Sequence, residues 1–407
     1  MSATTAERIR TYRGPAVLGL GFRPFFLAAG LWSALAMLLW ILLLTGGIDL
    51  PIALAPVDWH VHSLLYGFVP ATVTGFLLTA VPNWTGRLPV TGTPLLCLAL
   101  LWLAGRLAVL FGDVLGPLLS ALVDLAFLAA VFAVILRELL AGRNKRNLPV
   151  LALVGLLFLG NALFHLEAAR TGGAYYGTRV GILAILMLIM LIGGRIVPSF
   201  TRNWLVKRGA GRLPASFGRF DGVCLATAAT ALASWVVASE AAATAWLAGI
   251  AGALHLVRLG RWAGERTTAE PLLLVLHVAY AFVPLGFFLV LLAHVLPSTV
   301  LPVAAIHAWL AGGVGLMTLA VMTRASLGHS GRALTADWPT VAIFCALVVA
   351  ALARILAGTT LALPGLLHLA ATAWILAFGG FAVAYWPVLT GVAAGLKPSS
   401  PPPGRPR

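Results

Sequence analysis

The sequence predicts an all-α integral membrane protein with about twelve transmembrane helices, and two observations carry that prediction. Of the 407 residues, 61% are hydrophobic and only 10% are charged, whereas a soluble domain carries about a quarter charged residues. The chain also divides into apolar runs of about 20 residues, the length that crosses a bilayer as a helix. A soluble globular protein is therefore excluded.

Twelve apolar runs follow one another along the chain, and each is a candidate span. They cover residues 22–46, 59–82, 92–112, 115–138, 148–168, 177–198, 219–238, 241–259, 270–292, 302–323, 338–357 and 364–390. Together they form one transmembrane domain, residues 22–390. We expect a cytoplasmic segment before it, residues 1–21, and a disordered cytoplasmic tail after it, the Pro-rich residues 391–407.

The charges of the connections predict the orientation of these helices. Lys and Arg follow every even-numbered helix, and the odd-numbered connections mostly carry acidic residues: Asp49, Asp58, Asp113 and Glu240, with Arg170 as the main exception. Because basic loops stay on the cytoplasmic side, both termini are predicted to be cytoplasmic. This pattern also accounts for the net charge of +15, so nucleic-acid binding is not indicated.

Three helices end in similar sequences. These are TAVPNWTGR (79–87), RIVPSFTR (195–202) and LAVMTRASLGHSGR (319–332), at the ends of the second, sixth and tenth predicted spans. A four-helix unit repeated three times would produce this spacing. Helix ends that independently favour Pro, Thr and Arg would also produce it, so both explanations stay open.

Ionisable residues gather at one depth of the predicted membrane domain. Its outer third holds six of the nine histidines together with two arginines and one acid: His60, His62, His165, His294, His307, His368, Arg106, Arg354 and Asp124. Such groups are costly in a bilayer and usually face a site. Imidazole is a common ligand of haem iron and of copper, so the layer favours a metal or haem site. Interfacial or hydrogen-bonded histidines, and an ion pair of Arg106 or Arg354 with Asp124, are the alternatives.

The spacing of His60 and His62 leaves two geometries open. In a helix, residues i and i+2 point about 200° apart, so the two imidazoles would face different sites. In an extended segment they would share one face and could bind one metal ion. Three further histidines lie toward the cytoplasmic side: His255, His277 and His329. His277 is expected about 10 Å deep, and His329 follows the tenth helix, where it contacts a lipid phosphate or belongs to a second site.

Several stretches of the chain resemble the NnrS family of bacterial membrane proteins. The matching stretches are GFRPFFL (21–27), WHVHSLLYGF and GFLLTAVPNWTGR (59–87), LAGR (103–106), GGRIVPSFTRN (193–203), LHVAY (276–280) and VMTRASLGHSGR (321–332). The resemblance implies a multi-pass protein of the bacterial cytoplasmic (inner) membrane that contains haem b and copper and acts in the response to nitric oxide. Ser63 stands where the family has an acidic residue, which argues against proton transfer there, and Ser330 stands where it has threonine.

The family's histidine motifs fall on five residues of this chain: His60, His62, His277, His307 and His329. Combined with the outer layer, the resemblance predicts the cofactor-binding residues His60, His62, His165, His277, His307, Arg106 and Arg354. The predicted metal ligands are His60, His62, His307 and His329. No catalytic residue is assigned.

Two classes of function fit these predictions. The first is a redox protein that binds or reduces nitric oxide at haem with copper nearby, protects against nitrosative stress and takes electrons from quinol. The second is a twelve-helix transporter of copper or another small solute, because twelve spans with cytoplasmic termini are typical of transporters and Pro and Gly interrupt several helices. A purely structural protein would leave the histidine layer unexplained.

Overall fold

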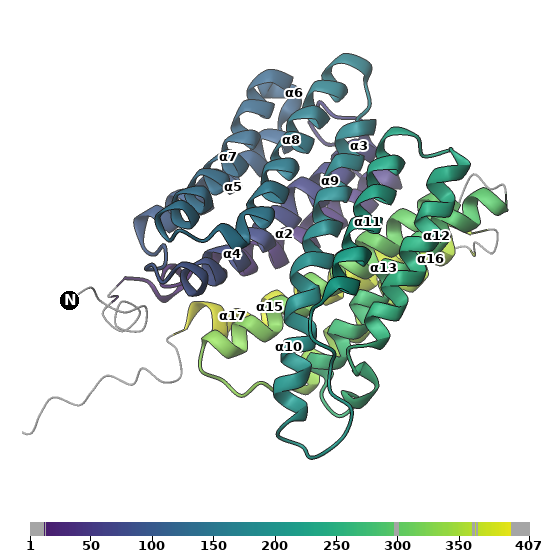
Figure 1. Ribbon diagram of the computed structural model, residues 1–407. Helices are drawn as coiled ribbons and strands as arrows, with labels where there is room; N and C mark the ends of the chain where they lie inside the picture. The colour runs from purple at the N-terminus through teal and green to yellow at the C-terminus, as the bar shows by residue number, and fades with distance from the viewer. Residues whose placement is uncertain (1–11, 13, 297–300, 360–362, 364, 392–407) are drawn as a thin grey trace, which may run out of the picture.

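The computed structural model describes residues 12, 14–296, 301–359, 363 and 365–391. These residues form helices and connections, with no β-strand among them. Twelve helices are long and apolar enough to cross a membrane, which confirms the predicted all-α, multi-pass membrane architecture (Figure 1). Most of the predicted N-terminal segment 1–21 and all but one residue of the predicted tail 391–407 lie outside the described residues.

The first six spans run from Phe22 to Leu205. Their helices are α2 (Phe22–Leu44), α3 (Pro56–His62), η2 (Ser63–Phe68), α4 (Val69–Thr85), α5 (Thr93–Leu110), α7 (Pro117–Ala141), α8 (Leu148–Thr171), α9 (Tyr175–Leu188), η4 (Ile189–Gly193) and α10 (Gly194–Leu205). Short helical turns lie beside them: η1 (Ala16–Leu18), α6 (Gly112–Leu115) and η3 (Lys145–Asn147).

The last six spans run from Arg219 to Thr390. Their helices are α11 (Arg219–Val237), α12 (Ala242–Gly260), α13 (Pro271–Val295), α14 (Leu301–His307), η6 (Ala308–Gly315), α15 (Leu316–His329), α16 (Trp338–Ala357) and α17 (Leu366–Thr390), with the turn η5 (Gly264–Arg266). Each predicted apolar run overlaps one observed span. The sixth and tenth helices continue past their predicted ends at 198 and 323, because helical hydrogen bonding does not stop where the hydrophobic sequence stops.

Three spans are interrupted by π-helical stretches. These are the second (α3, η2, α4), the sixth (α9, η4, α10) and the tenth (α14, η6, α15). They are the same three helices whose ends have similar sequences. The π stretches end at Phe68, Gly193 and Gly315, at different distances from the shared valines at 81, 197 and 321, so they do not align as one repeated unit. The threefold repeat stays a prediction.

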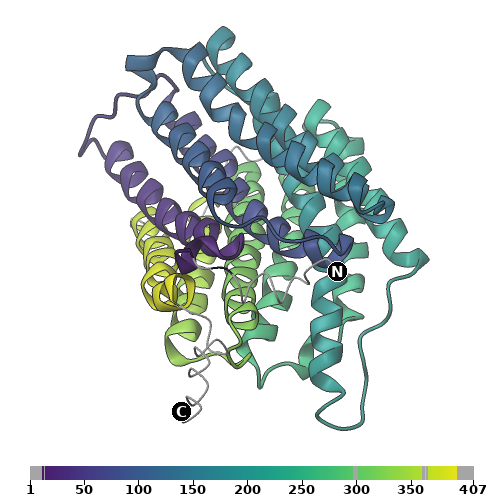
Figure 2. The same ribbon diagram turned by 90° about the vertical axis from the view of Figure 1, so that its left-hand side faces the viewer.

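The first and last spans close the bundle. Helices α2 and α17 pack side by side, as Figure 2 shows at the purple and yellow ends of the chain. The Arg23 guanidinium donates to the Gly391 carbonyl at 2.7 Å. The two ends of the membrane domain therefore lie on the same side of the bilayer, and the cytoplasmic assignment of that side stays a prediction.

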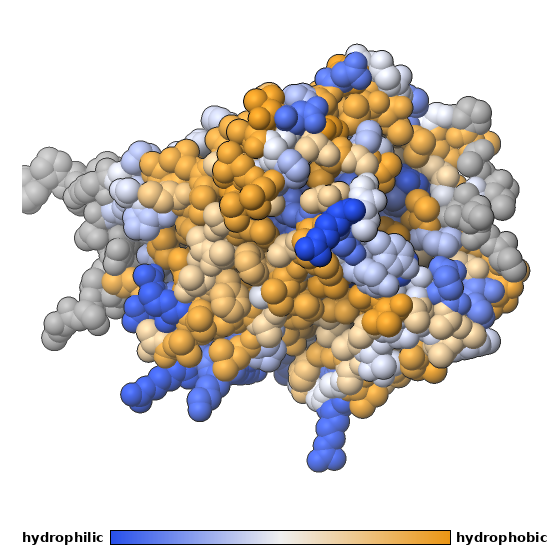
Figure 3. Space-filling model, turned by 90° about the horizontal axis from the view of Figure 1, so that it is seen from above, coloured by the Kyte–Doolittle hydropathy of each residue, from blue (hydrophilic) through white to orange (hydrophobic). Residues whose placement is uncertain are grey.

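The outer surface of the bundle is apolar. Many large hydrophobic side chains are exposed, including Leu118, Leu159 and Val383 at 74%, 60% and 77%. Hydrophobic residues cover much of the face in Figure 3, with hydrophilic residues in patches between and below them. Exposed apolar patches of this extent are rare on soluble monomers, whereas lipid tails solvate them. The surface therefore fits a multi-pass membrane protein.

Candidate metal centre

His60 and His62 both lie in helix α3, so this segment is helical and not extended. His62 is completely buried and points toward α7 and α8. His60 points elsewhere, because its ring stacks on Trp40 of α2 with a centroid distance of 4.5 Å. The two imidazoles therefore face two different places at the predicted outer end of the bundle.

Three side chains from three helices converge: those of His62, Asp124 and His165. The carboxylate Oδ2 of Asp124, on α7, lies 3.1 Å from Nε2 of His62 and 3.0 Å from Nε2 of His165, on α8. The candidate ligand atoms of the three residues all lie within 4.8 Å of one another. Two ligands of one ion, each bound at about 2.0–2.2 Å, are at most about 4.4 Å apart. A small adjustment would therefore bring all three onto a single metal ion.

Two more polar residues complete this cluster. The Arg106 guanidinium, from α5, pairs with Oδ1 of Asp124, and both side chains are almost fully buried. The Asn161 amide donates to Oδ2 of Asp124 at 2.7 Å, and its own oxygen lies 3.0 Å from Nε2 of His62. Since that nitrogen faces two oxygen acceptors, it carries the proton. The Nδ1 atom of His62 is then an unprotonated, buried nitrogen, and no described residue hydrogen-bonds to it.

This donor set fits a transition-metal ion. Two imidazoles and one carboxylate suit divalent copper, iron or zinc, and Nε2 of His62, which faces Asp124, would give up its proton on binding the ion. The Arg106 charge offsets that of Asp124 while the site holds no cation. We name the residues His62, Asp124 and His165, with their partners Arg106 and Asn161, the outer cluster.

The π-helical stretch after His62 makes room for the Arg106 side chain. A Cβ atom on Gly67 would lie 2.6 Å from Nη1 of Arg106 and 2.8 Å from the Trp32 indole nitrogen. Two indoles also donate to carbonyls of this stretch at 2.9 Å, Trp32 to Ser63 and Trp102 to Gly67. These bonds satisfy carbonyls that a regular α-helix would pair internally.

Gly67→Ala is therefore expected to displace Arg106 from Asp124 and to weaken metal binding, because the new methyl group occupies the guanidinium's position. The metal content of the purified variant tests this. Gly222→Ala is the matched control, since a Cβ atom at Gly222 of α11 would meet nothing within 4 Å. Equal metal loss in both variants, or none in either, would contradict the assigned role of Gly67.

Comparison with known proteins identifies the family of this chain. A family model described as NnrS protein matches residues 16–392, which is nearly the whole chain. The chain belongs to the NnrS family. No curated protein matches it. Membership in the NnrS family supports a membrane protein of the nitric oxide response, and the predicted family resemblance is thereby confirmed.

A second polar group of this NnrS chain lies at the same end of the bundle. His60 is in electrostatic range of His307 and Arg354. The Nδ1 atom of His307 donates to the Val303 carbonyl at 2.8 Å, so its Nε2 atom is the unprotonated nitrogen when the ring is neutral. Nδ1 of His60 is buried, and no described side chain or backbone group pairs with it. The predicted outer residues thus separate into two places, with His62, His165 and Arg106 in one and His60, His307 and Arg354 in the other.

The structure does not bring His277 or His329 to either place. His277, on α13, pairs through Nε2 with the Thr201 hydroxyl at 2.9 Å. The His329 ring lies 5.8 Å from that of Phe22, at the predicted cytoplasmic end. Both were predicted as cofactor or metal residues in line with the family motifs, and neither can share a metal ion with His62. His294 and His368, which belong to the outer layer by sequence, are exposed.

Sequence reasoning missed a second buried polar network in this NnrS chain. Arg258 of α12 donates to Asp221 of α11 at 2.8 Å, to the Met190 carbonyl at 2.9 Å and to the Tyr280 hydroxyl at 2.8 Å. The same hydroxyl lies 2.7 Å from Nδ1 of His255. His255 and Arg258 are three residues apart and therefore share one helix face, and this spacing could have indicated the network from the sequence.

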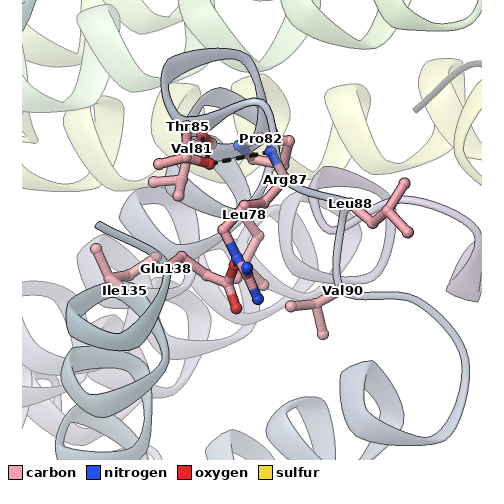
Figure 4. Close-up of a pocket in the computed structure, with 9 residues that line it drawn as sticks. All are labelled: Leu78, Val81, Pro82, Thr85, Arg87, Leu88, Val90, Ile135 and Glu138. Atoms are coloured by element: carbon pink, nitrogen blue, oxygen red, sulfur yellow. Dashed lines mark hydrogen bonds and ion pairs between the residues drawn. The ribbon is translucent and has the colours of Figure 1, made fainter. Parts of the chain in front are cut away.

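An exposed arginine pairs with a nearly buried acid at the opposite end. Arg87, after α4, contacts Glu138 of α7, and Figure 4 shows the two side chains pointing toward each other below Leu78 and Val81. The pocket beside them has a volume of about 10 Å³, which holds about one water molecule. This contact joins a connection to a helix and leaves no space for a ligand.

Proposed function

We propose that this membrane protein binds a copper ion at His62, Asp124 and His165 and uses it to bind or reduce nitric oxide, which protects the cell from nitrosative stress. The observation that supports the proposal best is the convergence of two imidazoles and one carboxylate within 4.8 Å. For haem b, which the family resemblance implies, His60 and His307 are the residues that would hold the iron. Imidazole is the usual protein ligand of haem iron.

The protein's own residues would hold the metal ligands in place, balance their charge and admit protons. Arg106 balances the carboxylate charge of Asp124, and Asn161 fixes the His62 ring through Nε2. His165 is the partly exposed member, with 8% of its side chain accessible, so protons from the predicted outer side would enter there. Arg354 would pair with a haem propionate, as a guanidinium does with carboxylates.

Reduction of nitric oxide requires a source of electrons and protons. Two nitric oxide molecules, two electrons and two protons give nitrous oxide and water. A quinol releases two electrons and two protons when it is oxidised to quinone, so quinol would balance the reaction. When bound, the metal centres would supply one-electron chemistry and a binding position for nitric oxide. In this proposal the protein is an oxidoreductase of the kind used in denitrification.

The test is the reduced-minus-oxidised visible spectrum of the purified protein, with metal analysis, before and after nitric oxide is added. We expect a haem b spectrum that shifts with nitric oxide, and copper in the wild type. His62→Ala and His165→Ala should each lose copper, because each removes one of three ligands. His368→Ala is the control, since His368 is exposed and should change nothing. A folded protein without absorption or metal would reject the proposal.

A transporter is the second candidate, and the interrupted spans favour it. Discontinuous helices near the middle of a bundle often line transport sites, and the second, sixth and tenth spans each contain a π-helical stretch. Uptake of copper into proteoliposomes distinguishes the two functions. Uptake that depends on His62, without a spectral response to nitric oxide, would support transport.

A further inference from the structure

A larger pocket lies at the other end of the bundle, lined by residues of α4, α10 and α15. Its volume is about 400 Å³, enough for a substantial part of an organic ligand. Arg195, Arg324 and His329 contribute to its wall, together with Asn83. No acidic residue is present among the described residues that line it. The pocket is therefore positively charged and suited to an anion.

Neither guanidinium group forms an ion pair with a described residue, although the Glu270 carboxylate is in electrostatic range of Arg324. Arg195 donates to the neutral Asn147 side chain at 3.1 Å. Arg324 lies over the Phe200 ring, 4.4 Å from its centroid, and no described group forms a hydrogen bond or ion pair with it. Both side chains are half-buried. Half-buried cations beside an acid-free cavity favour binding of a phosphate or carboxylate.

The polarity of the pocket changes with depth. Asn83, Arg195 and Arg324 lie within about three residues of the predicted cytoplasmic ends of their spans, or about 5 Å at 1.5 Å per residue. Phe76 and Ile192, which also line the pocket, lie deeper than the polar residues of the same helices: Phe76 is about 10 Å deeper than Asn83, and Ile192 is about 5 Å deeper than Arg195. Polar groups thus lie at the level of the lipid headgroups, and apolar groups lie at the level of the acyl chains.

We propose that this pocket binds an anionic phospholipid of the cytoplasmic leaflet, with its phosphate between Arg195 and Arg324. Basic pockets between transmembrane helices on the cytoplasmic side bind such headgroups. The apolar inner part, with Phe76 and Ile192, takes the beginning of an acyl chain. The gradient in polarity favours a lipid over free phosphate, and the paired positive charges favour an anionic lipid over a neutral quinol.

Native mass spectrometry of the full chain in neutral detergent tests the proposal, with phosphatidylglycerol, phosphatidylcholine and inorganic phosphate as separate probes. We expect one retained phosphatidylglycerol and little phosphatidylcholine. The double variant Arg195→Gln/Arg324→Gln should bind phosphatidylglycerol about tenfold more weakly, since it loses two charge-assisted contacts. Arg208→Gln is the matched control, because Arg208 also lies over an aromatic ring, that of Trp204, but does not line the pocket.

A second variant keeps both arginines and fills the space. Ala325 lines the pocket, so Ala325→Trp should also reduce phosphatidylglycerol retention while the net charge is unchanged. Retention that is equal in the wild type and both pocket variants would overturn the proposal. Retention of inorganic phosphate alone, with the same dependence on Arg195 and Arg324, would overturn the lipid assignment. Circular dichroism and size-exclusion chromatography establish that each variant is folded.

Discussion

Asp124→Asn is expected to lower the free energy of unfolding by about 3–5 kcal/mol and to remove the metal from the outer cluster. The Arg106 side chain is 1% exposed and pairs with Asp124, so the substitution leaves a buried guanidinium without a counter-charge. A neutral amide is also a poorer metal ligand than a carboxylate. Unfolding by SDS titration measures the first effect, and metal analysis measures the second.

A compensating substitution separates these two effects. Arg106→Met in the Asp124→Asn background removes the unpaired charge, so stability should largely return, whereas the metal should stay absent. The remaining asparagine can still accept hydrogen bonds from His62 and His165. An Asp124→Asn variant with wild-type stability would show that the buried ion pair does not stabilise the fold. Retained metal in that variant would place the metal centre elsewhere.

Arg258→Met should destabilise the fold by a similar amount, about 3–5 kcal/mol, without loss of metal. Arg258 is completely buried and donates to Asp221, to the Met190 carbonyl and to Tyr280. Methionine fills the space but leaves the Asp221 carboxylate without its closest cation. The same SDS titration and metal analysis apply.

The neighbouring arginine provides the control for this second prediction. Arg261 lies 3.6 Å from Asp221, and 32% of its side chain is exposed, so Arg261→Met should cost at most about 1 kcal/mol. Metal loss in Arg258→Met would place the metal centre at the buried network of Arg258, Asp221, Tyr280 and His255 instead of the outer cluster. Equal stability of Arg258→Met and Arg261→Met would show that burial does not decide the strength of these ion pairs.

Local sequence properties determined the number and the approximate position of the helices. A membrane span needs about 20 apolar residues whatever its neighbours are, so hydropathy located all twelve spans. The same reasoning placed His60, His62, His165 and Asp124 at one depth, because depth follows from position along a helix. The family resemblance was also readable from short motifs such as WHVHSLLYGF and VMTRASLGHSGR, and the family model confirms it.

Only the tertiary structure decided which of these side chains meet. Depth does not fix the rotation of a helix or the identity of its neighbours, so the sequence could not separate His60 from His62 or assign Asp124 to His62 and His165. The π-helical stretch after His62 changes the helical phase, and no hydropathy pattern reports such a change. The cationic pocket likewise joins Arg195 and Arg324, which lie on spans that only packing brings together.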